Sequence, residues 1–154
     1  MRKFSTAATG ALVVGLGVAL AGCSQVNALK AKMAFKAANT LYQQQDYRGA
    51  KAKYEEAVAL DPNLTDAFFF LANSADNLYK PARKGQPAND ALLPQAVDNY
   101  KLAAERATQP NIKKLALEFL VSAYNSPDKM GDPSQAEPLL RRMIDMDPTS
   151  AMSW

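Results

Sequence analysis

Side chains that commonly perform chemistry are scarce in this chain of 154 residues, which contains one cysteine, Cys23, and no histidine. A cysteine–histidine metal site and an intramolecular disulfide therefore cannot form. A serine nucleophile would lack a histidine base, and the 7 glycines are too scattered for a phosphate-binding loop. Asp61 and Asp66 fall at expected helix ends, where capping explains them. We expect a protein that is not an enzyme and that uses neither a cofactor nor a metal.

The segment before Cys23 has the organisation of a secretory signal. Arg2 and Lys3 form a short basic start, and an apolar stretch follows at residues 11–21. This stretch is too short to cross a bilayer, which takes about 20 apolar residues. A basic start, a short apolar run and small residues at its end are typical of a cleaved signal. Residues 1–22 are therefore predicted to be a signal peptide.

The sequence Leu-Ala-Gly-Cys that ends at Cys23 resembles the lipobox of bacterial lipoproteins at every position. The resemblance implies that Cys23 receives a diacylglyceryl group and becomes the acylated first residue, with residues 23–28 as a lipidated tether. Ser24 is similar to the outer-membrane sorting pattern, which implies a lipid-anchored protein of the cell envelope, located at the outer membrane and facing the periplasm if the cell is Gram-negative. A buried structural cysteine that follows an apolar helix is the alternative.

The charge balance gives little support to nucleic-acid binding. The chain has 18 lysines and arginines against 15 aspartates and glutamates, a formal net charge of +3. Loss of the signal would remove Arg2 and Lys3 and no acid, which leaves 16 basic residues and a net charge of +1. The sequence also lacks a basic stripe interleaved with aromatic residues. Nucleic acid is therefore not an expected partner.

Apolar residues recur with helical spacing along the rest of the chain, and turn signals separate the runs. No segment alternates apolar and polar residues in the manner of a half-buried strand. We therefore predict an all-α protein built from antiparallel helix pairs. The expected helices lie near residues 28–44, 47–60, 65–79, 93–107, 112–126 and 134–146.

The first helix pair contains small and aromatic residues at regular positions. Small residues let two helices approach closely, and a ring from the second helix fills the space beside them. The residues at these positions are Ala38, Leu41, Ala50, Tyr54, Ala57 and Pro62. With them, the segment from residue 37 to residue 63 resembles a tetratricopeptide repeat, a helical hairpin of about 34 residues.

Two further pairs repeat the pattern, the second more closely than the third. The resemblance implies a tetratricopeptide-type αα-hairpin solenoid of about three repeats over residues 29–150, after the signal peptide. A longer spacing within the second pair predicts an insertion at about residues 80–92, which is either a recognition loop or a solvated spacer. The matching positions are Leu71, Ala72, Ala96, Tyr100 and Ala103, then Leu120, Val121, Tyr124, Ala136, Leu140 and Pro148.

Solenoids of this type bind partners on a concave face that the first helix of each pair lines. The resemblance therefore implies a groove for an extended or helical peptide. Of the consecutive Phe68, Phe69 and Phe70, which point about 100° apart on a helix, two are expected in the core and one half exposed. The residues expected in the groove are Lys32, Phe35, Lys36, Asn39, Tyr42, Phe69, Asn73 and Asn77.

Three interpretations of function follow. The first is a non-enzymatic scaffold or adaptor of the bacterial envelope that binds a partner protein or peptide in its groove. The second is the N-terminal part of a longer protein with a missing catalytic or effector region, because Trp154 lies where the family pattern expects a further repeat to begin, at residues 151–154. The third is a periplasmic small-molecule binder, which predicts a closed apolar pocket.

The membrane is the other expected partner, through lipid on Cys23. Three lysines, Lys30, Lys32 and Lys36, follow the expected anchor closely. They either contact anionic headgroups or form a solvated helix face.

Overall fold

The computed structural model describes residues 12–148, with side chains from residue 25 onward. Every regular element in this part of the chain is helical, which confirms the all-α prediction. The long helices are α1 (Leu12–Gln43), α2 (Tyr47–Leu60), α3 (Ala67–Leu78), α5 (Leu92–Arg106), α6 (Pro110–Asn125) and α7 (Ala136–Met146). The short elements are η1 (Pro81–Arg83) and α4 (Pro87–Asp90) between α3 and α5, and η2 (Pro133–Gln135) before α7.

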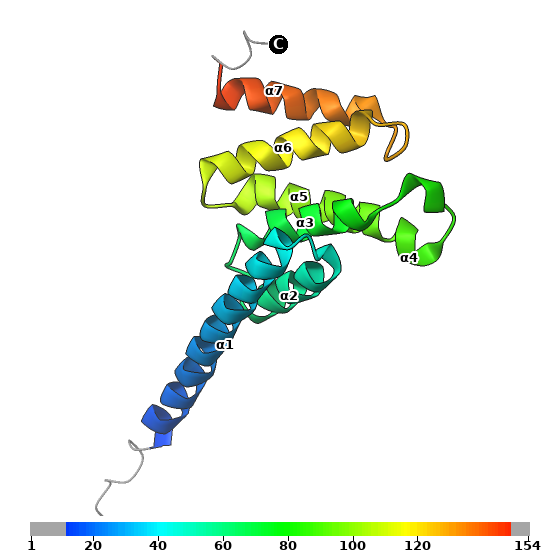
Figure 1. The fold of residues 1–154 in the computed structure, drawn as a ribbon. Helices are drawn as coiled ribbons and strands as arrows, with labels where there is room; N and C mark the ends of the chain where they lie inside the picture. Colours follow the sequence, from blue (N-terminus) through cyan, green and yellow to red (C-terminus); the bar gives the residue numbers. More distant parts are fainter. Residues whose placement is uncertain (1–11, 149–154) are drawn as a thin grey trace, which may run out of the picture.

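Each long helix packs against the next one along the chain, from α1 to α7. The hairpins α1–α2, α3–α5 and α6–α7 are stacked in a row, and α1 extends far beyond it at one end (Figure 1). Packing in which each unit contacts only its neighbours is the arrangement of a solenoid. The predicted tetratricopeptide-type helical solenoid is therefore confirmed.

Helix α1 is longer than the sequence pattern predicts. The expected helix began near residue 28, after a tether, whereas α1 begins at Leu12 and includes the backbone of Cys23. No proline separates the apolar run from the rest of α1, so the backbone hydrogen bonds continue through residues 23–28. Part of the expected signal peptide, residues 1–11, and the expected start of a further repeat at residues 151–154 lie outside the described residues.

A tight turn joins α1 to α2. Gln45 has a φ of 60°, in the left-handed region, and Asp46 caps the N-terminus of α2 by accepting from Gly49 N at 3.0 Å. Glycine at residue 49 permits this close approach, because a Cβ there would lie 2.5 Å from Asp46 Oδ2 and 3.2 Å from Leu41 Cδ1 and would displace the capping side chain. The cap and the glycine together fix the direction in which α2 leaves α1.

Three aromatic rings form a joint between the first and second helix pairs. Tyr54 of α2 is buried between Phe35 of α1 and Phe70 of α3. The Phe35 ring is tilted against the tyrosine at 5.7 Å between centroids, and the Phe70 ring stacks on it at 5.8 Å with an interplanar angle of 19°. Aromatic pairs of this kind contribute about 0.5–1.5 kcal/mol beyond the area they bury.

The same aromatic joint recurs between the second and third pairs. Phe69 of α3 is tilted against Tyr100 of α5 at 5.8 Å, and Phe119 of α6 stacks on Tyr100 at 5.3 Å with an interplanar angle of 19°. The two phenylalanines also contact each other edge-on at both joints. The second pair therefore repeats the first in three dimensions, despite the insertion between its helices.

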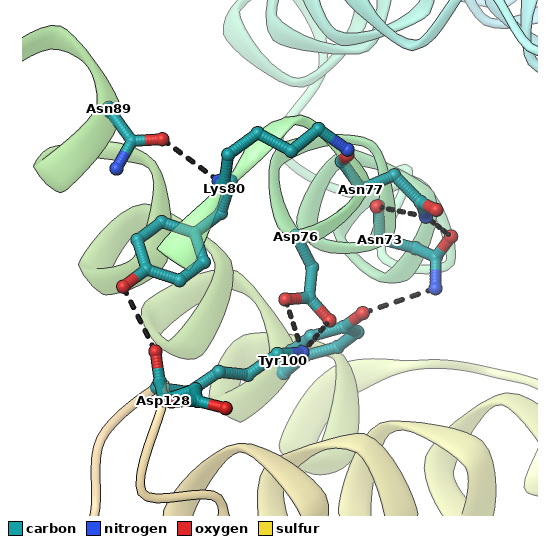
Figure 2. A network of polar contacts seen from close by, with 9 residues as sticks. Asn73, Asp76, Asn77, Lys80, Asn89, Tyr100 and Asp128 are labelled. Carbon is teal, nitrogen blue, oxygen red and sulfur yellow. Dashed lines mark hydrogen bonds and ion pairs between the residues drawn. The ribbon is translucent and has the colours of Figure 1, made fainter. Parts of the chain in front are cut away.

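Each joint tyrosine also bonds to an asparagine of its own helix pair. Tyr54 OH donates to Asn39 Oδ1 at 2.7 Å, and Asn73 Nδ2 donates to Tyr100 OH at 3.2 Å. Asn73 is buried and also accepts from Tyr42 OH at 2.6 Å. Figure 2 shows Asn73 bonded to Tyr100 across the α3–α5 interface. The buried asparagine therefore links α1, α3 and α5.

Within residues 12–148, the third pair has no such joint. Leu140 of α7 occupies the position of Tyr54 and Tyr100 in the repeat and is 43% exposed. Near the start of α7, Ala136 is buried against α6. Leu140 stays exposed because no helix in the described part of the chain follows α7.

The insertion between α3 and α5 is folded. Asn89 is buried and accepts from Lys80 N at 2.9 Å, and Asp90 accepts from Gly85 N at 2.8 Å. Gly85 has a φ of 95°, so it supplies a backbone conformation that other residues rarely adopt. The insertion projects from the row of helices at one side (Figure 1).

Removal of the Tyr100 hydroxyl should destabilise the fold more than removal of the Tyr54 hydroxyl. Tyr100→Phe leaves a buried amide hydrogen of Asn73 without its acceptor, at a cost of about 1–3 kcal/mol. Tyr54→Phe leaves Asn39 Oδ1 without its donor, but Asn39 is partly exposed, so water can replace the lost hydrogen bond. Urea unfolding of the full chain, followed by circular dichroism, compares the two free energies of unfolding. Equal losses of unfolding free energy in the two variants would contradict this expectation.

Candidate functional site

The structure separates the eight residues expected in the groove into three sets by exposure. The exposed ones are Lys32, Lys36 and Asn77, the half-buried ones are Phe35, Asn39 and Tyr42, and the buried ones are Phe69 and Asn73.

The expected placement of Phe69 and Asn73 at the groove surface is corrected, since each is only 5% exposed. Phe69 is a ring of the second aromatic joint, and Asn73 is the buried asparagine that links three helices. Neither side chain can contact a partner without rearrangement of the core. Of the three consecutive phenylalanines, Phe68 and Phe69 are buried and Phe70 is half-buried, as expected of two core rings and one other.

Two of the expected groove residues, Tyr42 and Asn77, hydrogen-bond to the side chain of Asn73. Asn77 Nδ2 donates to Asn73 O and to Asn73 Oδ1, both at 2.8 Å. Beside them, Asp76 accepts two bonds from Lys129 Nζ, at 2.6 and 2.8 Å. Figure 2 shows these contacts around the end of α3. Asn77 and Tyr42 therefore have structural roles, because their polar groups already bond within the protein.

A hollow of about 170 Å³ lies between α1, the start of α3 and the α5–α6 turn. This volume is below the roughly 300–1,000 Å³ of pockets that bind small molecules. It suits a single side chain of a larger partner. The apolar lining comes from Phe35, Leu64, Ala67 and Phe70, and the polar lining from Asn63, Thr65, Asp66, Thr108 and Gln109.

Asp66 holds one wall of the hollow in place. Its carboxylate accepts from Thr108 N at 2.8 Å and Oγ1 at 2.9 Å, and from Gln109 Nε2 at 2.9 Å and N at 3.4 Å. The expectation that Asp66 caps α3 is wrong, because its side chain makes no bond to the start of that helix. It instead joins the turn before α3 to the turn before α6.

These bonds lower the pKa of the Asp66 carboxyl. Burial raises that pKa, but the hydrogen bonds from Gln109 and Thr108 outweigh it and hold the pKa below its ordinary value of 3.8. Asp66 is therefore ionised at neutral pH, and its charge strengthens all four bonds.

Two lysines of α1 are close in sequence to Phe35, which lines the hollow. Lys36 follows Phe35 directly, and Lys32 lies about one turn before it. Both are exposed, and neither belongs to an ion pair recorded in the described part of the chain. Around the helix, Lys32 lies about 60° from Phe35 and Lys36 about 100° from it, so Lys32 is the cation on the side of the hollow.

Sequence reasoning placed Phe35 near the binding surface but missed the turn residues that line the hollow. Asn63, Thr108 and Gln109 come from two connections that are far apart in the chain. Their turn signals were visible in the sequence, but nothing in it showed that the two turns meet.

Two other kinds of site were sought in the described residues. No group of three or more histidine, cysteine, aspartate or glutamate residues there could hold a metal ion. In the same part of the chain, no helix combines the length and apolar character that a membrane span requires.

Protonation of Asp66 should weaken the fold at low pH. Because its pKa is lowered in the folded state, its contribution is complete above the ordinary value of 3.8 and is lost as pH falls through the folded pKa. Asp66→Asn lacks this contribution at every pH. Thermal unfolding at neutral pH and near pH 3 should show a gap in Tm between wild type and variant that narrows in acid. A gap that stays constant, or one shared with the exposed change Asp98→Asn, would argue against the role of Asp66.

Residues 31–64 match the family profile described as tetratricopeptide repeat. No curated protein matches the chain. The matched segment contains residues 31–43 of α1, all of α2 and the first residues of the turn toward α3. The match supports the tetratricopeptide repeat family and indicates a protein–protein interaction scaffold.

Proposed function

We propose that this protein is a membrane-tethered scaffold of the bacterial cell envelope that binds a partner protein or peptide. An apolar side chain of the partner occupies the hollow beside α1. The observation that carries the proposal is the pairing of Phe35 and Phe70 at the floor of that hollow, on two successive first helices of a solenoid. Tetratricopeptide repeat proteins are typically scaffolds without catalytic activity.

The chemistry of the hollow favours a particular kind of peptide. Burial of one aliphatic or aromatic side chain contributes roughly 1.5–3 kcal/mol, so a single anchor gives a useful part of the affinity. Lys32, about 60° from Phe35 around α1, suits an acidic residue beside that anchor. Exposed charges at the edge of an interface affect the association rate and its salt dependence more than the affinity. The expected partner segment is therefore apolar at its centre with an acidic residue beside it.

The tether is proposed from the sequence before the solenoid. The lipobox-like sequence ends at Cys23, and lipid there would hold the start of the mature chain at the membrane. Cys23 lies in α1 with Phe35, about 18 Å apart along the helix axis at 1.5 Å per residue. A helical connection of this kind supports a location in which the hollow is presented near, but not within, the membrane surface.

Lipidation of Cys23 can be tested by metabolic labelling with a fatty acid. The wild-type chain should take up the label and fractionate with membranes, whereas Cys23→Ser should do neither, because the thiol is the acceptor of the lipid. Ser24→Ala is the matched control, since it changes the neighbouring residue and keeps the thiol. Label on the Cys23→Ser chain would exclude this cysteine as the anchor.

Partner binding at the hollow can be tested by filling it. In Asn63→Trp, an exposed lining residue becomes a large ring that covers the hollow without deleting any core side chain. Affinity capture from detergent-solubilised envelopes, with mass spectrometry, should show a defined protein bound to wild type and reduced about tenfold or more by the variant, which corresponds to one lost apolar anchor.

Asn111→Trp is the control for this experiment, because Asn111 is exposed at the start of α6 and does not line the hollow. It should retain the partner. A partner that is retained by both variants, or lost from both, would contradict binding at the hollow.

A further inference from the structure

We propose that a stripe on the outer side of α1 binds the surface of an anionic lipid membrane. The stripe consists of Val26, Leu29 and Met33, which are 52%, 62% and 65% exposed. Their spacing of three and four residues places all three on one side of the helix. They are the three most exposed of the large apolar side chains recorded in the described part of the chain.

The stripe is distinct from the faces of α1 that the solenoid uses. Ala31, Ala34 and Ala38 are buried. Phe35 contacts Tyr54 and Phe70, on the side of the hollow. Met33 lies about 160° around the helix from Phe35, at about 100° per residue. The α1 stripe therefore faces away from the hollow, and the inference goes beyond the proposed peptide binding without depending on it.

Basic residues border the stripe on both sides. Lys30 and Lys36 each lie about 60° from Met33 around the helix, in opposite directions. Both are exposed, and no ion pair recorded in the described part of the chain includes either of them. The sequence of α1 contains no aspartate or glutamate at all. An apolar strip between lysines is the pattern of a helix that lies in the membrane interface.

This charge pattern favours an anionic membrane over a second copy of the chain as the partner of the stripe. A second copy of the chain packed on the stripe would bring the Lys30 and Lys36 of two molecules together with no acid on either α1, which disfavours self-association. An anionic lipid surface complements the stripe, because the apolar side chains enter the headgroup region while the lysines extend to the phosphates. The inference holds whether or not Cys23 is acylated.

The test measures the depth of one tryptophan in the full chain reconstituted in vesicles. The native tryptophan is removed by Trp154→Phe, and Met33→Trp places the only tryptophan in the stripe. Vesicles contain phosphatidylcholine with brominated acyl chains, with or without phosphatidylglycerol. With phosphatidylglycerol, we expect the emission to be quenched and shifted to shorter wavelength, and without it much less.

Two controls separate contact by the stripe from anchoring of the chain. Glu105→Trp, in the Trp154→Phe background, reports an exposed position on α5 in the equally anchored protein and should stay unquenched. Adding Lys30→Gln and Lys36→Gln to the Met33→Trp chain should lower the ratio of membrane-bound to unbound stripe about 25-fold, since each lysine near an anionic surface gives roughly a fivefold factor. Lys53→Gln with Arg106→Gln removes the same charge elsewhere and should have no such effect.

Equal quenching at positions 33 and 105 would overturn the inference. Quenching at position 33 that changes neither with phosphatidylglycerol nor with the Lys30→Gln and Lys36→Gln substitutions would also overturn it. A tryptophan at position 33 that remains unquenched in anionic vesicles but shifts on addition of polyglutamate would assign the stripe to an acidic protein and also overturn it. None of these readouts uses a partner of the hollow, so they are independent of the proposed scaffold function.

Discussion

The arrangement of the molecule depends on a buried tyrosine ring held between two phenylalanine rings from successive first helices. At each joint the stacked and tilted contacts have nearly the same geometry, at Tyr54 and again at Tyr100. Because the tyrosine is fixed by an asparagine of its own pair, the ring also sets the rotation of the following helix. The joints thus determine how one hairpin is placed on the next.

The hollow is a consequence of this stacking. The first joint brings Phe35 and Phe70 together, so their outer edges form a shared apolar floor. Asp66 then closes one side by joining the turn before α3 to the turn before α6. The proposed site is built from a joint and a turn contact, so it needs no large pocket to receive one side chain of a partner.

Only part of the circumference of helix α1 packs against the rest of the solenoid. Small alanines on one side are buried and Phe35 belongs to the first joint, whereas Val26, Leu29 and Met33 remain exposed. Since no acid lies in α1, its free surface combines apolar character with positive charge. Under the two proposals above, the same helix connects a membrane surface to the recess that receives the partner. Separate faces allow both contacts to form together.

The sequence by itself determined the six long helices and their pairing, except for the start of α1. The spacing of Ala50, Tyr54 and Pro62 identified the first hairpin because close helix packing requires small and aromatic residues at fixed intervals. Only the tertiary structure decided that Phe69 is buried and Phe70 borders the hollow, because that choice depends on the rotation of α3 against its neighbours. It also decided that Asp66 bonds across to Thr108 and Gln109, since local spacing contains no information on which distant turns meet.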